Sequence, residues 1–198
     1  MIYLLRHGQI QTGDQFRLVG QRDLPLTELG QRQAAWWRRE LAGVAWQGVY
    51  SSDLSRTRHF AAIVAGVEPE QVTALAELRE ILLGQWEGLS RAELEERFPA
   101  QWEERGRNIA GYRPAGGESF VDVQKRALPA LRRIAAAHTG DVLVTAHAGV
   151  NRVVLCGLLD IDLNDLFELQ QDYACLNLIA TSDHGLKVKS MNLPCGAR

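Results

Sequence analysis

Short apolar runs alternate with longer segments of helical periodicity along most of the chain. Short apolar runs are typical of buried strands, whereas apolar positions three and four residues apart indicate amphipathic helices. The predicted strands are residues 2–5, 48–52, 71–75, 141–146, 176–181 and 186–191, the last two forming a hairpin that turns at 182–185. The predicted helices are residues 27–41, 54–66, 119–138 and 149–159. This alternation predicts an α/β fold: a three-layer sandwich with a mainly parallel central sheet and helices on both faces.

One segment, residues 84–117, interrupts this alternation. It is rich in Trp, Arg and Glu and contains Gly and Pro. We expect it to form a cap-like insertion over one end of the sheet, inside a single domain that spans residues 1–198, because 198 residues suit one well-packed domain better than two.

Polar residues stand where three of the helices are expected to begin. Thr27, Ser55 and Ser119 each precede or open a helical pattern, and their hydroxyl oxygens can accept a hydrogen bond from a backbone N–H of the first turn. We therefore expect all three to act as N-caps.

Composition narrows the classes of partner and compartment. The formal net charge is −2, so no overall positive field attracts nucleic acid or an anionic membrane, and no apolar run approaches the roughly 20 residues of a membrane span. Three widely spaced cysteines, Cys156, Cys175 and Cys195, indicate reduced thiols. We expect a cytoplasmic protein, a monomer or homodimer, that binds neither nucleic acid nor membrane.

Basic and imidazole side chains follow three of the predicted strands. Arg6 and His7 follow the first, Arg56 lies in the helix after the second, and His147 follows the fourth. Ligands of open α/β sheets bind outside the carboxyl ends of the strands, so these four side chains should meet at one edge. Two arginines and two histidines there predict an anion site.

Phosphate is the anion that suits these residues best. Arginine presents a planar fork of donors that matches phosphate oxygens, and the helix after His147 adds backbone N–H groups. Gly8 would let the backbone approach the anion closely, and a neutral imidazole can act as a nucleophile. No Cys or Ser nucleophile motif and no metal-ligand spacing competes, and Glu80 is a candidate proton donor for the leaving group.

Five sequence blocks, in order, resemble the phosphoglycerate mutase-like branch of the histidine phosphatase superfamily over essentially the whole chain. The blocks begin with the R-H-G run at residues 6–8 and continue as "GQRDLPLTELGQRQA", "SSDLSRTRHFA", "LREILLGQWEG" and "TAHAGVNR". Within that family, the segment "GGES" at residues 116–119 and the short chain look most like α-ribazole-5′-phosphate phosphatases.

The resemblance implies a role for each matching residue. His7 would be the nucleophile that forms a phosphohistidine, and Glu80 the proton donor and later the base. Substrate-binding residues would be Arg6, Arg56, His147, Gly8, Gln9 and Gly20. Members of the family use no metal, so no cofactor is expected.

This chain departs from the family at two positions near the nucleophile. Ile10 stands where members often have Thr, and Gly13 where Asn is frequent. Both residues assist phosphate or substrate binding in the family, so affinity or orientation can differ here. Glu87, beside Trp86, is the competitor of Glu80 as the acid.

The preferred function is that of a phosphomonoesterase acting on a small phosphorylated metabolite, with α-ribazole 5′-phosphate as the candidate substrate. The alternatives are a phosphoglycerate mutase-type isomerase and a non-catalytic module that binds a phosphorylated ligand.

Arg105 lies among glutamates, a pattern that predicts surface ion pairing, whereas Trp86, Trp102 and Tyr112 suggest an apolar outer wall of the pocket, suited to an uncharged or aromatic leaving group. Arg152, one turn past His147, is expected to support the residues of the anion site without contacting the anion itself.

Overall fold

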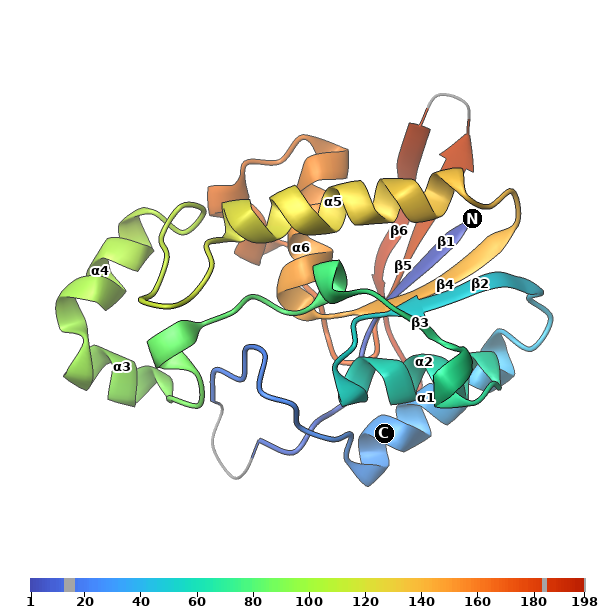
Figure 1. Cartoon of the computed structure of the whole chain (residues 1–198), viewed down its shortest axis with the longest axis horizontal. Helices are drawn as coiled ribbons and strands as arrows, with labels where there is room; N and C mark the ends of the chain where they lie inside the picture. The colour runs from blue at the N-terminus through green and yellow to red at the C-terminus, as the bar shows by residue number, and fades with distance from the viewer. Residues whose placement is uncertain (13–16, 183–184, 198) are drawn as a thin grey trace.

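A six-stranded sheet forms the centre of the computed structural model, which describes residues 1–12, 17–182 and 185–197 (Figure 1). The strands are β1 (Ile2–Arg6), β2 (Trp46–Ser51), β3 (Thr73–Ala74), β4 (Asp141–Ala146), β5 (Leu176–Ser182) and β6 (Gly185–Leu193). Their order is β3-β2-β4-β1-β5-β6. The first four strands pair in parallel, β5 is antiparallel to β1, and β6 is antiparallel to β5. The predicted mainly parallel sheet and its closing hairpin are confirmed.

Helices cover both faces of this sheet (Figure 1). On one face lie α1 (Glu28–Glu40) and α2 (Ser55–Ala65), and on the other α5 (Phe120–Ala136) and α6 (Ala148–Leu159). Along β4, Val142 and Val144 pack with α5 and α6, whereas Leu143 between them packs with α1 and α2. Successive strand residues point to opposite faces, so a strand that is apolar throughout serves two cores. The predicted three-layer sandwich is confirmed.

Residues 84–117 contain two short helices, α3 (Arg91–Arg97) and α4 (Pro99–Arg107), and the 3-10 helix η3 (Gly84–Trp86). In Figure 1 the two helices lie to one side of the sheet, beyond the start of α5. Their core contact is aromatic: the ring of Trp86 is buried, stacks on Tyr112 with 5.2 Å between centroids, and lies 6.1 Å from that of Trp102. These three side chains therefore hold the segment together.

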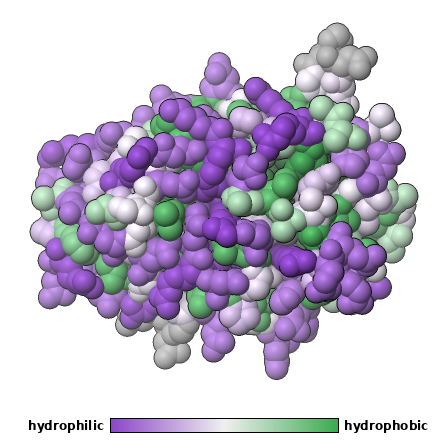
Figure 2. Space-filling view, in the orientation of Figure 1, coloured by the Kyte–Doolittle hydropathy of each residue, from purple (hydrophilic) through white to green (hydrophobic). Residues whose placement is uncertain are grey.

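The remaining elements are 3-10 helices in the connections. They are η1 (Pro69–Gln71), η2 (Ala76–Leu78) and η4 (Leu163–Glu168). Hydrophilic residues cover most of the surface seen in Figure 2, with hydrophobic residues visible between them. In the part of the chain that the structure describes, no helix is both long and apolar enough to pass through a bilayer.

Two of the three expected N-caps are confirmed. The Thr27 hydroxyl accepts the N–H of Gly30, and the Ser119 hydroxyl accepts that of Asp122. The expectation for Ser55 is wrong, because Leu54 occupies the N-cap position and Ser55 is the first residue of α2. A distant carboxylate serves that helix end instead: Asp23 Oδ1 accepts both the N–H and the hydroxyl of Ser55.

The end of β1 contacts the start of α1 without a side chain between them. A Cβ placed on Gly8 would lie 2.6 Å from the carbonyl oxygen of Gly30, and a Cβ on Gly30 would collide with the carbonyl oxygen of Gln9. That carbonyl also accepts the N–H of Thr27 at 2.9 Å. Two glycines therefore let the segment after β1 lie directly on α1, next to the residues of the predicted anion site.

We predict that Gly30→Ala destabilises the fold. The added methyl group meets backbone, which cannot rotate away, so the cost should be about 1–3 kcal/mol even though alanine is the better helix former. Gly43→Ala is the control, because a Cβ there meets nothing within 4 Å. Urea denaturation of both variants measures the difference, and equal stabilities would contradict the close packing of this segment.

Candidate active site

The predicted anion site is a pocket at the carboxyl ends of the parallel strands. Arg6 ends β1, His147 follows β4, and Arg56 lies in the first turn of α2, which follows β2. The pocket has a volume of about 180 Å³. Among its lining residues are Arg6, His7, Gly20, Arg56, Glu80 and Gly149. The two histidine rings lie 5.2 Å apart, centroid to centroid, so His147 borders the same site.

His7 is held as a neutral imidazole with a free ring nitrogen. Its Nδ1 lies 2.7 Å from the carbonyl oxygen of Gly8, which can only accept, so Nδ1 carries the proton and Nε2 has the lone pair. The side chain is 4% exposed. Burial, followed by the charges of Arg6 and Arg56, lowers the pKa of His7 well below 6.5. A buried imidazole with an unprotonated Nε2 is suited to nucleophilic attack.

His147 takes the opposite tautomer. Arg56 Nε donates to His147 Nδ1 at 3.3 Å, so the proton of the neutral ring sits on Nε2 and is donated to the hydroxyl oxygen of Ser52 at 2.8 Å. Burial, followed by the charges of Arg56, His7 and Arg6, lowers the pKa of His147 well below 6.5. Ser52, which is fully buried, was not predicted from the sequence, because nothing in "SSDLSR" distinguishes it from the adjacent serine.

Backbone carbonyls fix the guanidinium of Arg56. Its Nη1 donates to the carbonyl of Arg22 at 2.6 Å and its Nη2 to the carbonyl of Gly20 at 2.8 Å. A guanidinium has five N–H groups, and with Nε engaged by His147 two remain for a ligand. Gly20, expected to bind substrate, lines the pocket and also orients Arg56; its φ of 56° is readily available only to glycine.

Arg6 is positioned from the other side of the pocket. Its Nη1 donates to the carbonyl of Gln171 at 2.7 Å, and its guanidinium carbon lies 3.8 Å from the centre of the Tyr173 ring. Its Nε is buried without a hydrogen-bond partner among the residues that the structure describes. An unpaired buried donor is costly, and a bound anion would satisfy it.

Glu80 reaches the same pocket from the loop after η2. Its Oε1 accepts the N–H of Ile81 at 2.9 Å, and its Oε2 accepts the N–H of Gly149 in the first turn of α6 at 3.1 Å. A Cβ on Gly149 would collide with this carboxylate, so a larger residue there would displace Glu80. Glu87, its competitor, instead accepts the N–H of Gln21 at 2.8 Å and is not among the described residues that line the pocket.

Arg126 of α5, which was not among the residues predicted from the sequence, supports the Glu80 loop. Its guanidinium donates to three carbonyls of this loop, those of Glu77 and Arg79 at 2.7 Å and that of Glu80 at 3.1 Å. The Glu118 carboxylate pairs with Arg126 at 2.8 Å. A basic residue on the buried side of an amphipathic helix, three positions after Val123, was the available signal.

Gly8 and Gln9 contribute packing rather than pocket wall. Neither is among the lining residues within the described ranges, and their binding of substrate stays a prediction. The close approach at Gly8 is to Gly30, and the Gln9 side-chain oxygen accepts the Thr27 hydroxyl at 2.9 Å. Ile10 is 5% exposed, packs in the core beside α1 and also lines the pocket, whereas Gly13 lies outside the described residues.

The apolar side chains that line the pocket, among them Leu18, Val19 and Phe120, are not the aromatic residues predicted to form its outer wall. Trp86, Trp102 and Tyr112 pack against one another and, within residues 17–182, do not line the pocket. Arg105, expected to be paired at the surface, lines it instead, together with Arg152 and Phe167. The sequence pattern of α4 placed Arg105 among glutamates, but those glutamates are exposed while Arg105 is half-buried.

The three thiols are free cysteines and do not compete with His7 as nucleophiles. Burial raises the pKa of Cys156 and of Cys175 to about 11, so both are protonated at neutral pH. Among the described residues, no three His, Cys, Asp or Glu side chains gather in a way that would hold a metal ion. The titratable side chains that line the pocket carry imidazole, guanidinium, carboxylate or phenol groups.

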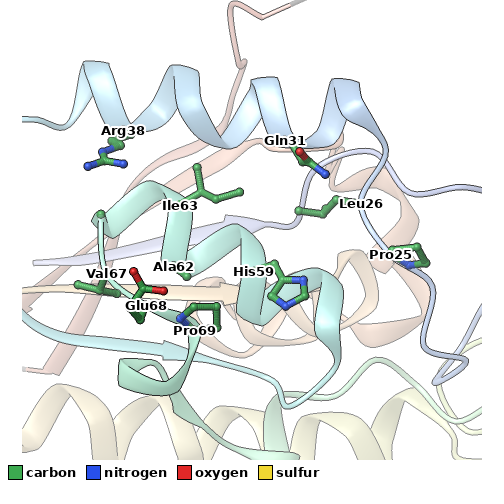
Figure 3. A pocket seen from close by; sticks show the side chains of 11 residues that line it. Pro25, Leu26, Gln31, Arg38, His59, Ala62, Ile63, Val67, Glu68 and Pro69 are labelled. Atoms are coloured by element: carbon green, nitrogen blue, oxygen red, sulfur yellow. The ribbon is translucent and has the colours of Figure 1, made fainter.

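A second pocket, of about 560 Å³, lies between α1 and α2. Figure 3 shows Gln31 and Arg38 of α1 facing His59 and Ile63 of α2 across it. Although it is larger, it contains none of the residues that the sequence nominated. Its mixed lining has no convergent set of groups comparable to that around His7.

Comparison with known proteins gives similarity over nearly the whole chain. The sequence profile of the histidine phosphatase superfamily (branch 1) matches residues 2–194. A glucosyl-3-phosphoglycerate phosphatase of Mycolicibacterium vanbaalenii is 31% identical over 83% of this chain and 76% of that protein. The adenosylcobalamin/alpha-ribazole phosphatase of Escherichia coli is 24% identical over 96% and 95%. The structure of Bacillus stearothermophilus YhfR has a TM-score of 0.88, with 30% identity over 98% and 96%.

We predict that His7 stays neutral, with its proton on Nδ1, at neutral pH. Because its pKa is lowered well below 6.5, the ring becomes protonated only at more acidic pH. Nitrogen chemical shifts of selectively labelled histidine should show the His7 ring still neutral at pH 6.5, where free histidine in the same buffer is about half protonated. A His7 ring that is half protonated at that pH would contradict the structure.

Proposed function

Because the chain belongs to the histidine phosphatase superfamily, branch 1, and is a phosphoric monoester hydrolase, we propose that it transfers the phosphoryl group of a small metabolite to His7 and then to water. The observation that carries the proposal is the unprotonated Nε2 of His7, buried between Arg6 and Arg56. A nucleophile that is neutral at physiological pH, beside two fixed cations, meets the needs of phosphoryl transfer.

In the first step, the lone pair of His7 Nε2 forms the bond to phosphorus while the ester P–O bond breaks. Arg6 and Arg56 donate to the phosphoryl oxygens, whose charge they balance throughout. The departing alkoxide takes its proton from the carboxyl group of Glu80, which the Ile81 and Gly149 N–H groups hold in place.

His147 contributes a further donor after a proton rearrangement. In the structure its Nδ1 accepts from Arg56, so no N–H points to a ligand. When a phosphoryl oxygen arrives, Arg56 Nε–H leaves His147 Nδ1 and donates to that oxygen, and water carries the ring proton from Nε2 to Nδ1. The Ser52 hydroxyl then turns to donate to Nε2, keeping the 2.8 Å contact. The ring then donates to the phosphoryl group without carrying a charge.

In the second step, water attacks the phosphorus atom and the N–P bond breaks. Glu80, now a carboxylate, removes the proton from the attacking water, and the pair of electrons returns to His7 Nε2. Inorganic phosphate leaves, and both groups have regained their starting protonation. No metal ion takes part in either step of this scheme.

The identity of the leaving group is the finer part of the proposal. α-Ribazole 5′-phosphate is a candidate because the Escherichia coli relative carries that activity in its name, and glucosyl-3-phosphoglycerate is a second for the same kind of reason. The mutase alternative predicts isomerisation of phosphoglycerates rather than phosphate release. The non-catalytic alternative predicts no hydrolysis of 4-nitrophenyl phosphate.

We predict that rapid quenching of turnover with labelled substrate traps phosphate on His7. The label should be lost in acid and survive in base, as an N–P bond does. His7→Ala should carry no such label and should lose at least about a thousandfold in kcat. His59→Ala, a change at an exposed histidine, is the control. A base-labile label, or one retained by His7→Ala, assigns the nucleophile to another residue.

We predict that Glu80→Gln lowers kcat on alkyl phosphates by about 10²–10³-fold. Its effect on 4-nitrophenyl phosphate should be much smaller, because nitrophenolate leaves without a proton. Glu87→Gln is the matched control: it lies outside the described pocket lining and should affect both substrates equally. Equal losses for Glu80→Gln on the two substrates would move the acid elsewhere.

A further inference from the structure

Two arginines line the catalytic pocket in addition to the pair at the strand ends. Arg105 comes from α4 and Arg152 from α6, and both share the pocket with His7 and Glu80. Within the described ranges, neither guanidinium forms an ion pair with a carboxylate. Both are half-buried, so their charges are partly removed from water.

Several neighbouring arginines are paired with carboxylates, in contrast to these two. Arg17, which also lines the pocket, lies 2.8 Å from Glu93, and Arg113 lies 2.7 Å from Asp122. On α4 itself, Arg107 pairs with Glu103 one turn away. The charges of these three arginines are thus matched, whereas those of Arg105 and Arg152 at the pocket are not matched by a carboxylate among the described residues.

Both guanidinium groups lie near the ring of Phe167 of η4. The guanidinium carbon of Arg105 lies 5.3 Å from the centre of the Phe167 ring, and that of Arg152 lies 5.4 Å from it. Arg152 Nε donates to the carbonyl of Leu169 at 2.8 Å. These contacts use the π face of the ring and one N–H group, so most donors of both side chains stay available.

The charge around Arg152 is not neutralised by its surroundings. Burial, followed by the charge of Arg6, lowers the pKa of Arg152, and the carboxylate of Glu80 opposes this only in part. Burial also lowers the pKa of Arg105. Both groups nevertheless stay protonated at neutral pH. Arg6 and Arg56 already serve the phosphoryl group, so an excess of positive charge remains for another part of the substrate.

We propose that Arg105 and Arg152 form a second anion subsite, which binds a carboxylate on the leaving group of the substrate. This rests on the proposed function, since it assigns the phosphoryl group to the other arginine pair. A planar carboxylate matches a guanidinium fork with two parallel hydrogen bonds. The pocket volume of about 180 Å³ suits a phosphorylated hydroxy acid of a few carbons. The leaving group of α-ribazole phosphate has no anion and would leave the subsite empty.

The test compares two substrates that differ at one group. 3-Phosphoglycerate carries a carboxylate where glycerol 3-phosphate carries a hydroxymethyl group. Measured by phosphate release, the kcat/KM of the wild-type enzyme should be at least about tenfold higher for 3-phosphoglycerate than for glycerol 3-phosphate. In Arg105→Met and in Arg152→Met this ratio should fall at least about fivefold toward one. Lysine at either position should restore part of the ratio, because it keeps the charge but loses the fork.

Arg107→Met is the matched control. It removes an exposed, paired arginine from the same helix and should leave the ratio and both rates at wild-type values. Thermal unfolding of every variant reports folding separately. A wild-type ratio near one, or a ratio that neither methionine variant changes, overturns the subsite.

A binding measurement separates this inference from the proposed function. Calorimetry with the His7→Ala variant compares the affinities of the same two ligands without turnover, and the subsite predicts tighter binding of 3-phosphoglycerate. If wild type fails to hydrolyse 4-nitrophenyl phosphate while this preference persists, the proposed function fails and the subsite stands. If 4-nitrophenyl phosphate is hydrolysed and the preference is absent, the subsite alone fails. Formation of 2-phosphoglycerate without phosphate release would move the site to the mutase class.

Discussion

Positive charge next to two buried imidazoles is the constraint on which this site depends. Arg6 and Arg56 cannot lose their protons, and burial already disfavours a charged ring, so His7 and His147 are both held neutral. In the proposed mechanism, the same two cations that keep the lone pair of His7 free also attract the phosphate that it attacks. Nucleophile activation and substrate binding then have one electrostatic origin.

The cations are held mainly by backbone carbonyls rather than by carboxylates. Arg56 donates to the carbonyls of Gly20 and Arg22, and Arg6 to that of Gln171. A carbonyl orients a guanidinium without cancelling its charge, whereas an ion pair would reduce its attraction for phosphate. Arg126 differs, because it pairs with Glu118 and works only through the carbonyls of the Glu80 loop. Free charge is kept where the substrate binds and neutralised where only support is needed.

Chemistry and specificity come from different parts of the chain. The ends of β1 and β4 and the start of α2 carry the phosphoryl site, and their positions follow from the rigid sheet. Arg105 and Phe167 come from α4 and η4, outside the sheet, and they form the other wall of the pocket. Connections outside a sheet tolerate change more readily than the strands, so substrate choice can vary while the phosphoryl site is preserved.

The hydrophobic pattern alone determined the strand and helix positions, and the strand-end rule brought Arg6, His7, Arg56 and His147 to one edge of the sheet. Those inferences succeed because they depend on local periodicity and on a general property of parallel sheets. The predicted N-cap of α2 was wrong, because the carboxylate that accepts the N–H of Ser55 belongs to Asp23, 32 residues earlier in the sequence. The predicted ion pairing of Arg105 was wrong for a related reason. The glutamates next to it in the sequence are exposed, whereas Arg105 itself lies at the pocket beside Phe167. Tautomers, carbonyl partners and unpaired charges are set by atoms that meet only after folding, and so only the tertiary structure decided them.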